Sequence, residues 1–211
     1  VKSPLSAIRG AAELLQEPMA DADRARFVAN IARETQRIQE LVDRMMELTA
    51  LESRRSLDAT APLAMRPLLN ELAASALPSA EARGLHIVVQ EGPDDASVEA
   101  DAFLLQRALS NLIDNALDFS PPGGTVTLGI QRHRRTVDLT VRDHGPGIPD
   151  YAEDKVFEKF YSLARPNTRK KSTGLGLPFV KEIAELHEGR VTLRNASDGG
   201  AIATLSLPLS G

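Results

Sequence analysis

The sequence predicts an α+β protein in which a helical hairpin, half of a dimeric four-helix bundle, precedes an α/β sandwich with a mixed sheet. Three patterns lead to this prediction. Apolar residues recur at helical spacing through the first 51 residues. Residues 52–62 are polar and irregular, as expected of a linker. Beyond them, helical runs are interspersed with short runs of strand character, which favours helices packed on a sheet.

The N-terminal part is expected to form two antiparallel helices over residues 1–16 and 23–51, joined by a turn that contains Pro18. The second helix carries a heptad seam in which Glu34 is the one polar member. One hairpin cannot bury such seams alone, so we expect a homodimer that forms a four-helix bundle. Because the first helix is the shorter, it cannot cover the C-terminal end of the second helix. We expect that end, with Leu41, Met45 and Leu48, to be exposed, frayed or packed against another chain.

The C-terminal part alternates helices and strands. Gly84, a Pro-Pro-Gly-Gly run and an Asp-Gly-Gly turn separate its elements. We expect helices at 67–83, 99–119 and 177–187, and strands at 85–90, 125–133, 136–143, 191–195 and 201–207.

Composition limits the function. The chain has 211 residues, which fits one or two domains, and 42% apolar with 26% charged residues is ordinary for a soluble protein. The absence of cysteine excludes disulfides, thiol catalysis and cysteine metal sites. A net charge of −4 argues against nucleic-acid binding. No apolar run reaches the roughly 18 residues of a membrane span, so we expect no membrane contact by this piece.

Two asparagines lie within the helix expected at 99–119. Its apolar stripe consists of three leucines, Ala116 and Phe119, whereas Asn111, Asn115 and Asp118 share another face. Asparagine is not favoured inside helices, so this pair needs a reason. A side-chain amide oxygen is a suitable ligand for Mg²⁺, although two asparagines on a solvated face remain the alternative.

Two glycine motifs follow. Asp143-His144-Gly145-Pro146-Gly147-Ile148 ends an expected strand, and Thr173-Gly174-Leu175-Gly176-Leu177 opens an expected helix. Glycines allow a ligand to approach the backbone, and the free N–H groups of a helix start attract anions. Each motif alone is weak, but their order and spacing after the two asparagines are specific.

These motifs resemble the N, G1 and G2 boxes of sensor histidine kinases, members of the Bergerat-fold group that includes gyrase and MutL. Phe157-Glu158-Lys159-Phe160-Tyr161 resembles the F box. The resemblance implies a dimerisation and histidine-phosphotransfer hairpin at 1–55 and a Bergerat-type ATP-binding domain at 62–211. Short stretches, such as 116–119, 147–152, 160–163 and 191–195, look like the CreC subgroup.

The resemblance implies ATP and Mg²⁺ as cofactors and assigns roles to residues. Asn115 would be the Mg²⁺ ligand, and Asn111 would touch phosphate or orient the nucleophile. Asp143, otherwise a turn former, would accept a hydrogen bond from the adenine amino group. The implied ATP-binding residues are Asn111, Asn115, Asp143, Gly145, Gly147, Ile148, Phe160, Tyr161, Thr173, Gly174, Leu175, Gly176 and Leu177.

Other residues near these motifs leave alternatives open. The cations in 165–172 would help to neutralise the triphosphate, or they simply belong to a solvated loop. Asp118 and Ser162 stand where many relatives have basic residues. A carboxylate there would be repelled by phosphate unless Asp118 binds the cation's water shell or turns outward. We interpret His187 as a capping or core residue and the remaining histidines as structural or exposed.

The implied function is transfer of the γ-phosphoryl group of ATP to a histidine on the first helix, and from there to an aspartate of a response regulator. Val1-Lys2-Ser3-Pro4-Leu5 resembles the tail of the H box, whose His-Glu pair would lie immediately before Val1. We therefore interpret the chain as an N-terminally truncated cytoplasmic fragment, unable to phosphorylate itself, of a protein anchored in a bacterial inner membrane. Ser3 would assist the reverse phosphatase reaction.

Two other functions are kept as alternatives. A Bergerat-fold ATPase would need a base, commonly a carboxylate, where Asn111 stands, and an amide cannot activate water. A non-catalytic nucleotide-binding dimerisation module would bind ATP without transferring phosphate.

Overall fold

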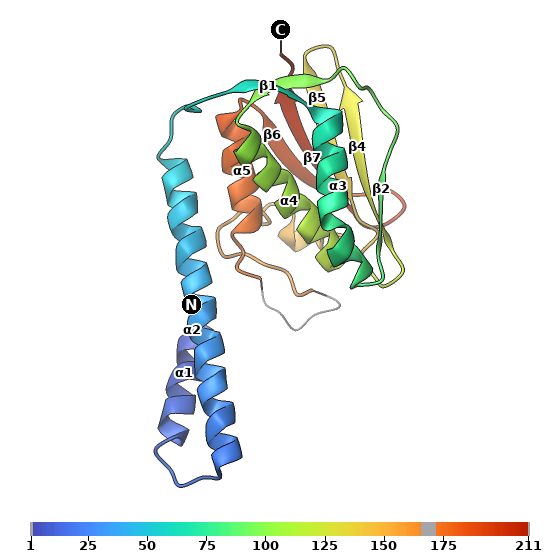
Figure 1. Ribbon diagram of the computed structural model, residues 1–211. Coiled ribbons are helices and arrows are strands. Elements are labelled where there is room, and N and C mark those ends of the chain that lie inside the picture. Colours follow the sequence, from blue (N-terminus) through green and yellow to red (C-terminus); the bar gives the residue numbers. More distant parts are fainter. Residues whose placement is uncertain (1, 166–171, 211) are drawn as a thin grey trace. The chain divides into compact units, whose positions relative to one another are not determined.

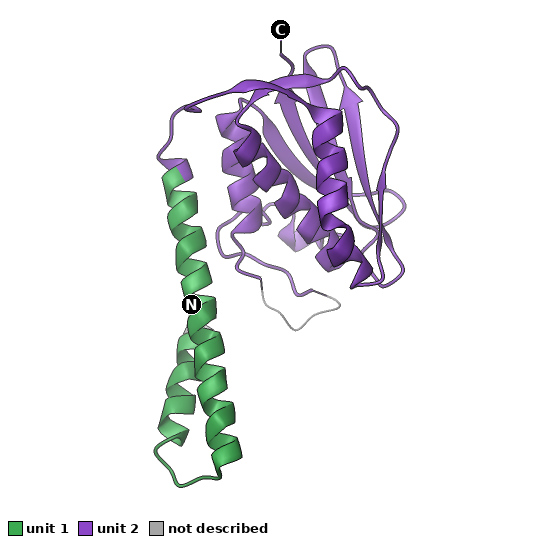
Figure 2. Cartoon of the chain, in the orientation of Figure 1, with its two compact units in different colours: residues 1–50 green, residues 51–211 purple. Residues whose placement is uncertain are grey.

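The computed structural model describes residues 2–165 and 172–210, with the side chains of the first helix described from Pro4 onward. Its contacts divide the chain into two compact units, Val1–Ala50 and Leu51–Gly211 (Figure 2). None of the helices within the described ranges is both long enough and apolar enough to cross a membrane.

The first unit contains α1 (Lys2–Leu14) and nearly all of α2 (Asp21–Glu52), which lie side by side as a hairpin (Figure 1). Apolar side chains on both helices remain exposed, including Leu5 at 52% and Val28 at 54%. Met45 is also exposed, at 47%, as expected. Leu48 is buried, however, so that part of the prediction was wrong. Leu48 and Leu51, which lie three residues apart on one face of α2, are both buried.

The second unit is built on a five-stranded sheet with strand order β2-β4-β5-β7-β6. The strands are β2 (His86–Val89), β4 (Thr125–Arg132), β5 (Thr136–Arg142), β6 (Arg190–Asn195) and β7 (Ala201–Pro208). β2 pairs with β4 in parallel and the other neighbours are antiparallel, which confirms the mixed sheet. β7 comes last in the sequence yet lies inside the sheet, between β5 and β6.

Helices α3 (Met65–Glu81), α4 (Ala102–Phe119) and α5 (Gly176–Leu186) cover one face of this sheet (Figure 1). The core forms between them, because alternate strand residues and the apolar helix stripes point inward. Its fully buried members include Leu105, Leu109, Leu112, Leu128, Leu139, Ile183 and Leu205. This layering brings Phe119, at the end of α4, close to Gly145 in the loop that follows β5.

A small second sheet was not predicted. β1 (Ala61–Ala64) pairs antiparallel with β3 (Ser97–Ala100), so residues 99 and 100 belong to a strand and not to the next helix. The helix begins at Ala102 because the Asp101 carboxylate accepts a hydrogen bond from Leu104 N at 3.1 Å, which caps the first turn.

Candidate functional site

The two asparagines of α4 lie beside the start of α5. A Cβ atom placed on Gly176, the first residue of α5, would lie 3.5 Å from Asn111 Oδ1 and 4.0 Å from Asn115 Nδ2. Asn111 Nδ2 donates to the Arg107 carbonyl at 3.1 Å, and the Arg107 guanidinium stacks over the Phe179 ring of α5 at 4.8 Å. The fold therefore brings two carboxamides to a helix N-terminus, where unpaired N–H groups favour an anion.

The segment before α5 is held by the aromatic motif. Gly174 has φ +67°, and a Cβ there would come within 2.5 Å of the Phe160 carbonyl carbon. Phe160 also has a positive φ, +65°, and its N–H donates to the Gly174 carbonyl at 2.8 Å. Thr173 Oγ1 accepts from Leu175 N at 3.4 Å. This close backbone approach explains why glycine stands at position 174.

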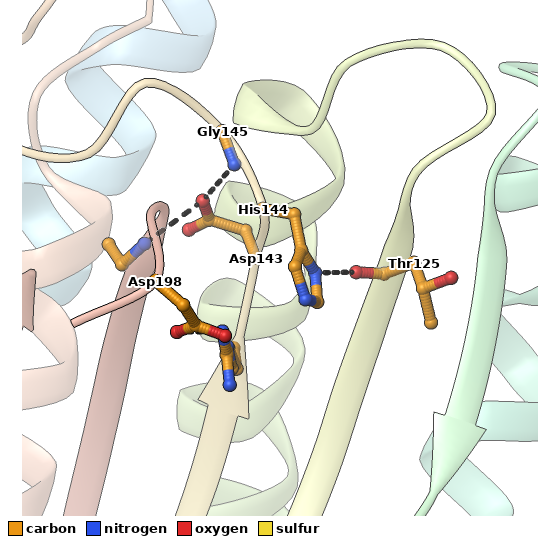
Figure 3. A network of polar contacts seen from close by, with 7 residues as sticks. Thr125, Asp143, His144, Gly145 and Asp198 are labelled. Atoms are coloured by element: carbon orange, nitrogen blue, oxygen red, sulfur yellow. Dashed lines mark hydrogen bonds and ion pairs between the residues drawn. The ribbon is translucent and has the colours of Figure 1, made fainter. Parts of the chain in front are cut away.

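Asp143 follows β5 and is buried, with 8% of its surface exposed. Its Oδ1 accepts hydrogen bonds from Gly145 N at 2.8 Å and from Ala201 N at 3.2 Å (Figure 3). Desolvation raises the pKa of this carboxyl above its ordinary value of 3.8, although the two backbone hydrogen bonds lower it. Oδ2 accepts no hydrogen bond from the described part of the chain. A Cβ on Gly145 would lie 2.4 Å from the Phe119 carbonyl oxygen, so no larger residue fits beside Asp143.

The turn between β6 and β7 supports the first glycine motif. Asn195 Oδ1 accepts from Ile148 N at 2.6 Å, and Asn195 Nδ2 donates to the Ile148 carbonyl at 2.8 Å. Gly147 has φ +76° and would place a Cβ 2.5 Å from Asn195 Oδ1. Sequence reasoning did not identify Asn195 as a site residue. The available signal was its position at the end of an expected strand, just before a glycine-rich turn.

Ile148 anchors the motif in a small apolar cluster with Ala152, Val156 and Ala201. Tyr161 and Leu177, from the aromatic motif and from α5, pack against this cluster. The two glycine motifs and the aromatic motif thus share one support.

Asp118 lies near the end of α4 with only 13% of its side chain exposed. Its Oδ1 pairs with Arg83 Nη1 at 2.7 Å and its Oδ2 with Arg165 Nη2 at 2.6 Å. The expected alternative of an outward orientation was therefore wrong, because the carboxylate is held by two arginines. Two cations more than compensate the carboxylate, so the cluster carries a net positive charge.

The histidines have structural contacts. His187 is buried, and its Nε2 accepts from Asp101 N at 3.1 Å while Nδ1 lies 2.8 Å from the Ile183 carbonyl, which confirms the capping interpretation. His144 is exposed, with Nδ1 2.8 Å from the Thr125 carbonyl (Figure 3). Nearby, a hydrogen bond from Arg142 lowers the pKa of the Asp198 carboxyl.

The side chain of Ser3 and the cations Arg169, Lys170 and Lys171 lie outside the described residues. Ser162 is described and is exposed.

Comparison with known proteins identifies the family to which this arrangement belongs. Residues 100–211 match the family described as histidine kinase-, DNA gyrase B- and HSP90-like ATPase, and residues 1–54 match the His Kinase A (phospho-acceptor) domain. The chain belongs to the sensor histidine kinase family. It is 44% identical to the sensor protein CreC of Escherichia coli (strain K12) over 207 residues, which are 98% of this chain and 43% of CreC. The resemblance to the CreC subgroup is therefore confirmed.

Solved histidine kinases share the fold. Histidine kinase ThkA in complex with the response regulator protein TrrA matches 99% of this chain and 58% of that chain, with a TM-score of 0.78 and 20% identity. Full-length ShkA in complex with AMPPNP matches 99% of this chain and 43% of that chain, with a TM-score of 0.74 and 24% identity. This sensor kinase chain spans less than half the length of CreC.

Proposed function

We propose that this chain is the cytoplasmic dimerisation and ATP-binding part of a membrane-anchored sensor kinase, with residues 1–55 as the dimerisation hairpin and 62–211 as the catalytic domain. One observation carries the proposal: the paired carboxamides of α4 lie against the N-terminus of α5, on the same unit as a buried aspartate with an unused acceptor oxygen. Support also comes from two structural relatives, since ShkA was solved with AMPPNP and ThkA with a response regulator.

The adenine base is assigned to the first glycine motif. Asp143 is well suited to accept from the exocyclic amino group, because its Oδ1 is occupied by backbone donors and its Oδ2 is not. A base bound here would approach the backbone at Gly145 and Gly147, where a side chain would collide with Phe119 or Asn195. Ile148, Phe160 and Tyr161 would complete the binding region.

The triphosphate and Mg²⁺ are assigned to the asparagines and the second glycine motif. Asn115 would supply an oxygen ligand to Mg²⁺, and Asn111 would contact phosphate or orient the nucleophile. The described residues include no group of three or more acidic or histidine side chains that could hold a metal ion. Mg²⁺ would therefore share its ligands with the phosphates and water, as it commonly does. Residues 173–177 would offer backbone N–H groups to the phosphates.

The proposed reaction is phosphoryl transfer, in which positioning and charge neutralisation supply most of the catalysis. No histidine precedes His86 in the sequence, so the proposed acceptor on the first helix lies outside these 211 residues. The exposed apolar faces of α1 and α2 would be covered in a homodimer. The phosphoryl group would then pass to an aspartate of a receiver domain. Ser3 would assist the opposing phosphatase reaction, in which water hydrolyses the phosphorylated aspartate.

Isothermal titration calorimetry tests the nucleotide site. Asn115→Ala should weaken binding of ATP in the presence of Mg²⁺ by about tenfold, which is about 1.4 kcal/mol. Asn70→Ala removes an exposed asparagine from α3 and serves as the matched control, with unchanged affinity. Absence of heat for the unmodified chain would refute the proposed function.

Radiolabelled ATP distinguishes the three functions considered. A kinase should transfer label to a separately supplied helical domain that contains the acceptor histidine, without labelling this chain. Release of inorganic phosphate would indicate an ATPase instead. Binding without transfer or release would indicate a non-catalytic module.

A further inference from the structure

We propose that Asn195 is a positioning residue for the nucleotide base, acting through the backbone of Gly147 and Ile148. The inference rests on the proposed function, because it requires the base to meet the segment between Asp143 and Ile148.

The side chain of Asn195 makes two hydrogen bonds to one residue, Ile148. Asn195 Oδ1 accepts from Ile148 N at 2.6 Å, and its Nδ2 donates to the Ile148 carbonyl at 2.8 Å. The amide thus satisfies both backbone groups of Ile148, as a paired strand would. Ile148 itself is buried, with 6% exposed, so its position is also fixed from the core side.

Gly147 lies against the same side chain. Its φ of +76° is a conformation that residues with a side chain rarely adopt, and a Cβ there would lie 2.5 Å from Asn195 Oδ1. The side chain of Asn195 therefore occupies the space beside this glycine. This side chain sets how closely the backbone at Gly147 approaches the end of β6.

The start of β7, which pairs with the end of β6, holds the other end of the segment at Asp143. Ala201 N donates to Asp143 Oδ1 at 3.2 Å, and Asp143 N donates to the Ala201 carbonyl at 3.0 Å. Gly200 lies so close that a Cβ would come within 2.1 Å of the Asp143 carbonyl oxygen. The segment is thus held at both of its ends. Ala201 holds Asp143, and the side chain of Asn195 holds Ile148.

Asn195 is well placed for a test, because its side chain is exposed and its removal opens no core cavity. In calorimetry with adenosine, ADP and ATP, Asn195→Ala should weaken all three ligands by the same factor, about fivefold to tenfold, since they share the base. Asn115→Ala should instead weaken ATP and spare adenosine. Ser197→Ala, an exposed change on the β6–β7 turn, should alter none of them. The number of sites should stay at one, because misfolding lowers the number of sites and not the affinity of those that remain.

A second measurement uses the unmodified protein. Hydrogen exchange at the Ile148 amide should be slowed at least tenfold relative to an unstructured peptide, and exchange at the unprotected rate would overturn the proposal. Unchanged affinity for adenosine in Asn195→Ala, or a loss confined to ATP, would overturn it as well. If the unmodified chain binds none of the three ligands, the proposed function fails first, and the two failures are thereby distinguished.

Discussion

Replacing Gly147 by alanine should destabilise the second unit strongly, and Gly123 provides a matched comparison. The two glycines have nearly identical φ angles, +76° and +77°. A Cβ on Gly123 meets nothing within 4 Å, whereas a Cβ on Gly147 lies 2.5 Å from Asn195 Oδ1. The difference between the two variants therefore isolates the contact with Asn195 from the cost of the backbone conformation.

The magnitudes follow from these contacts. Placing alanine in the left-handed region costs about 1–2 kcal/mol, and this is the whole effect expected for Gly123→Ala. At Gly147 the new methyl group must displace the Asn195 side chain, and the two hydrogen bonds to Ile148 are worth about 1 kcal/mol each. Gly147→Ala should therefore lower the free energy of unfolding by about 3–4 kcal/mol, roughly 2 kcal/mol more than the control.

Urea unfolding followed by tyrosine fluorescence measures this difference. The chain has no tryptophan and two tyrosines, Tyr151 and Tyr161, so the signal comes from the second unit alone. Equal losses of stability in the two variants would show that the Asn195 contact contributes nothing, and the reasoning about this turn would be refuted.

Three further predictions concern buried polar groups. Asp118→Asn should lower the free energy of unfolding by about 2 kcal/mol in urea titrations, because it removes the negative charge between two arginines and turns one acceptor oxygen into an NH2 donor, whereas Asp95→Asn, at an exposed ion pair, should cost less than about 1 kcal/mol. His187→Phe should cost about 1–3 kcal/mol in the same titration, because the Asp101 N–H loses its acceptor. Nucleotide affinity measured against pH should fall on acidification through the raised pKa of Asp143, because the carboxylate is the better acceptor, and Asp143→Asn should abolish this dependence. Because the pKa of Asp143 is raised in the folded state, protonation of this carboxyl favours the folded state below pH 3.8. This contribution to the free energy of unfolding is lost as the pH rises through the folded-state pKa. A nucleotide affinity that stays constant as the pH falls through the folded-state pKa of Asp143 would contradict the role of this residue.

The larger elements could be predicted because their periodicities are long. The stripe of α4, which includes Leu105, Leu109 and Leu112, repeats over five turns, and all three leucines are fully buried. β1 and β3 could not be predicted in the same way. Each has four residues, and their pairing joins Ala61 to Ala100, so only the tertiary structure brings them together.

The site was predictable where the backbone itself requires a particular residue. Gly147 and Gly174 have positive φ angles, and close approach excludes a side chain at both, so the sequence preserves these requirements as glycines. The partners of Asp118 were not predictable. Arg83 and Arg165 lie in loops far from Asp118 in the sequence, and neither shows a local pattern that connects it to α4. Asn195 was missed for the same reason, since its contact with Ile148 spans 47 positions.

The placement of β7 has a consequence for synthesis. A nascent chain that has emerged from the ribosome only as far as β6 contains the asparagine pair and both glycine motifs. The strand position between β5 and β6 is then empty. Asp143 would still lack the donor Ala201, and β6 would have no neighbour to hold Asn195 beside Ile148. β7 therefore completes the proposed nucleotide site, and termination of translation just before Ala201 should yield a chain with intact motifs and no competence to bind.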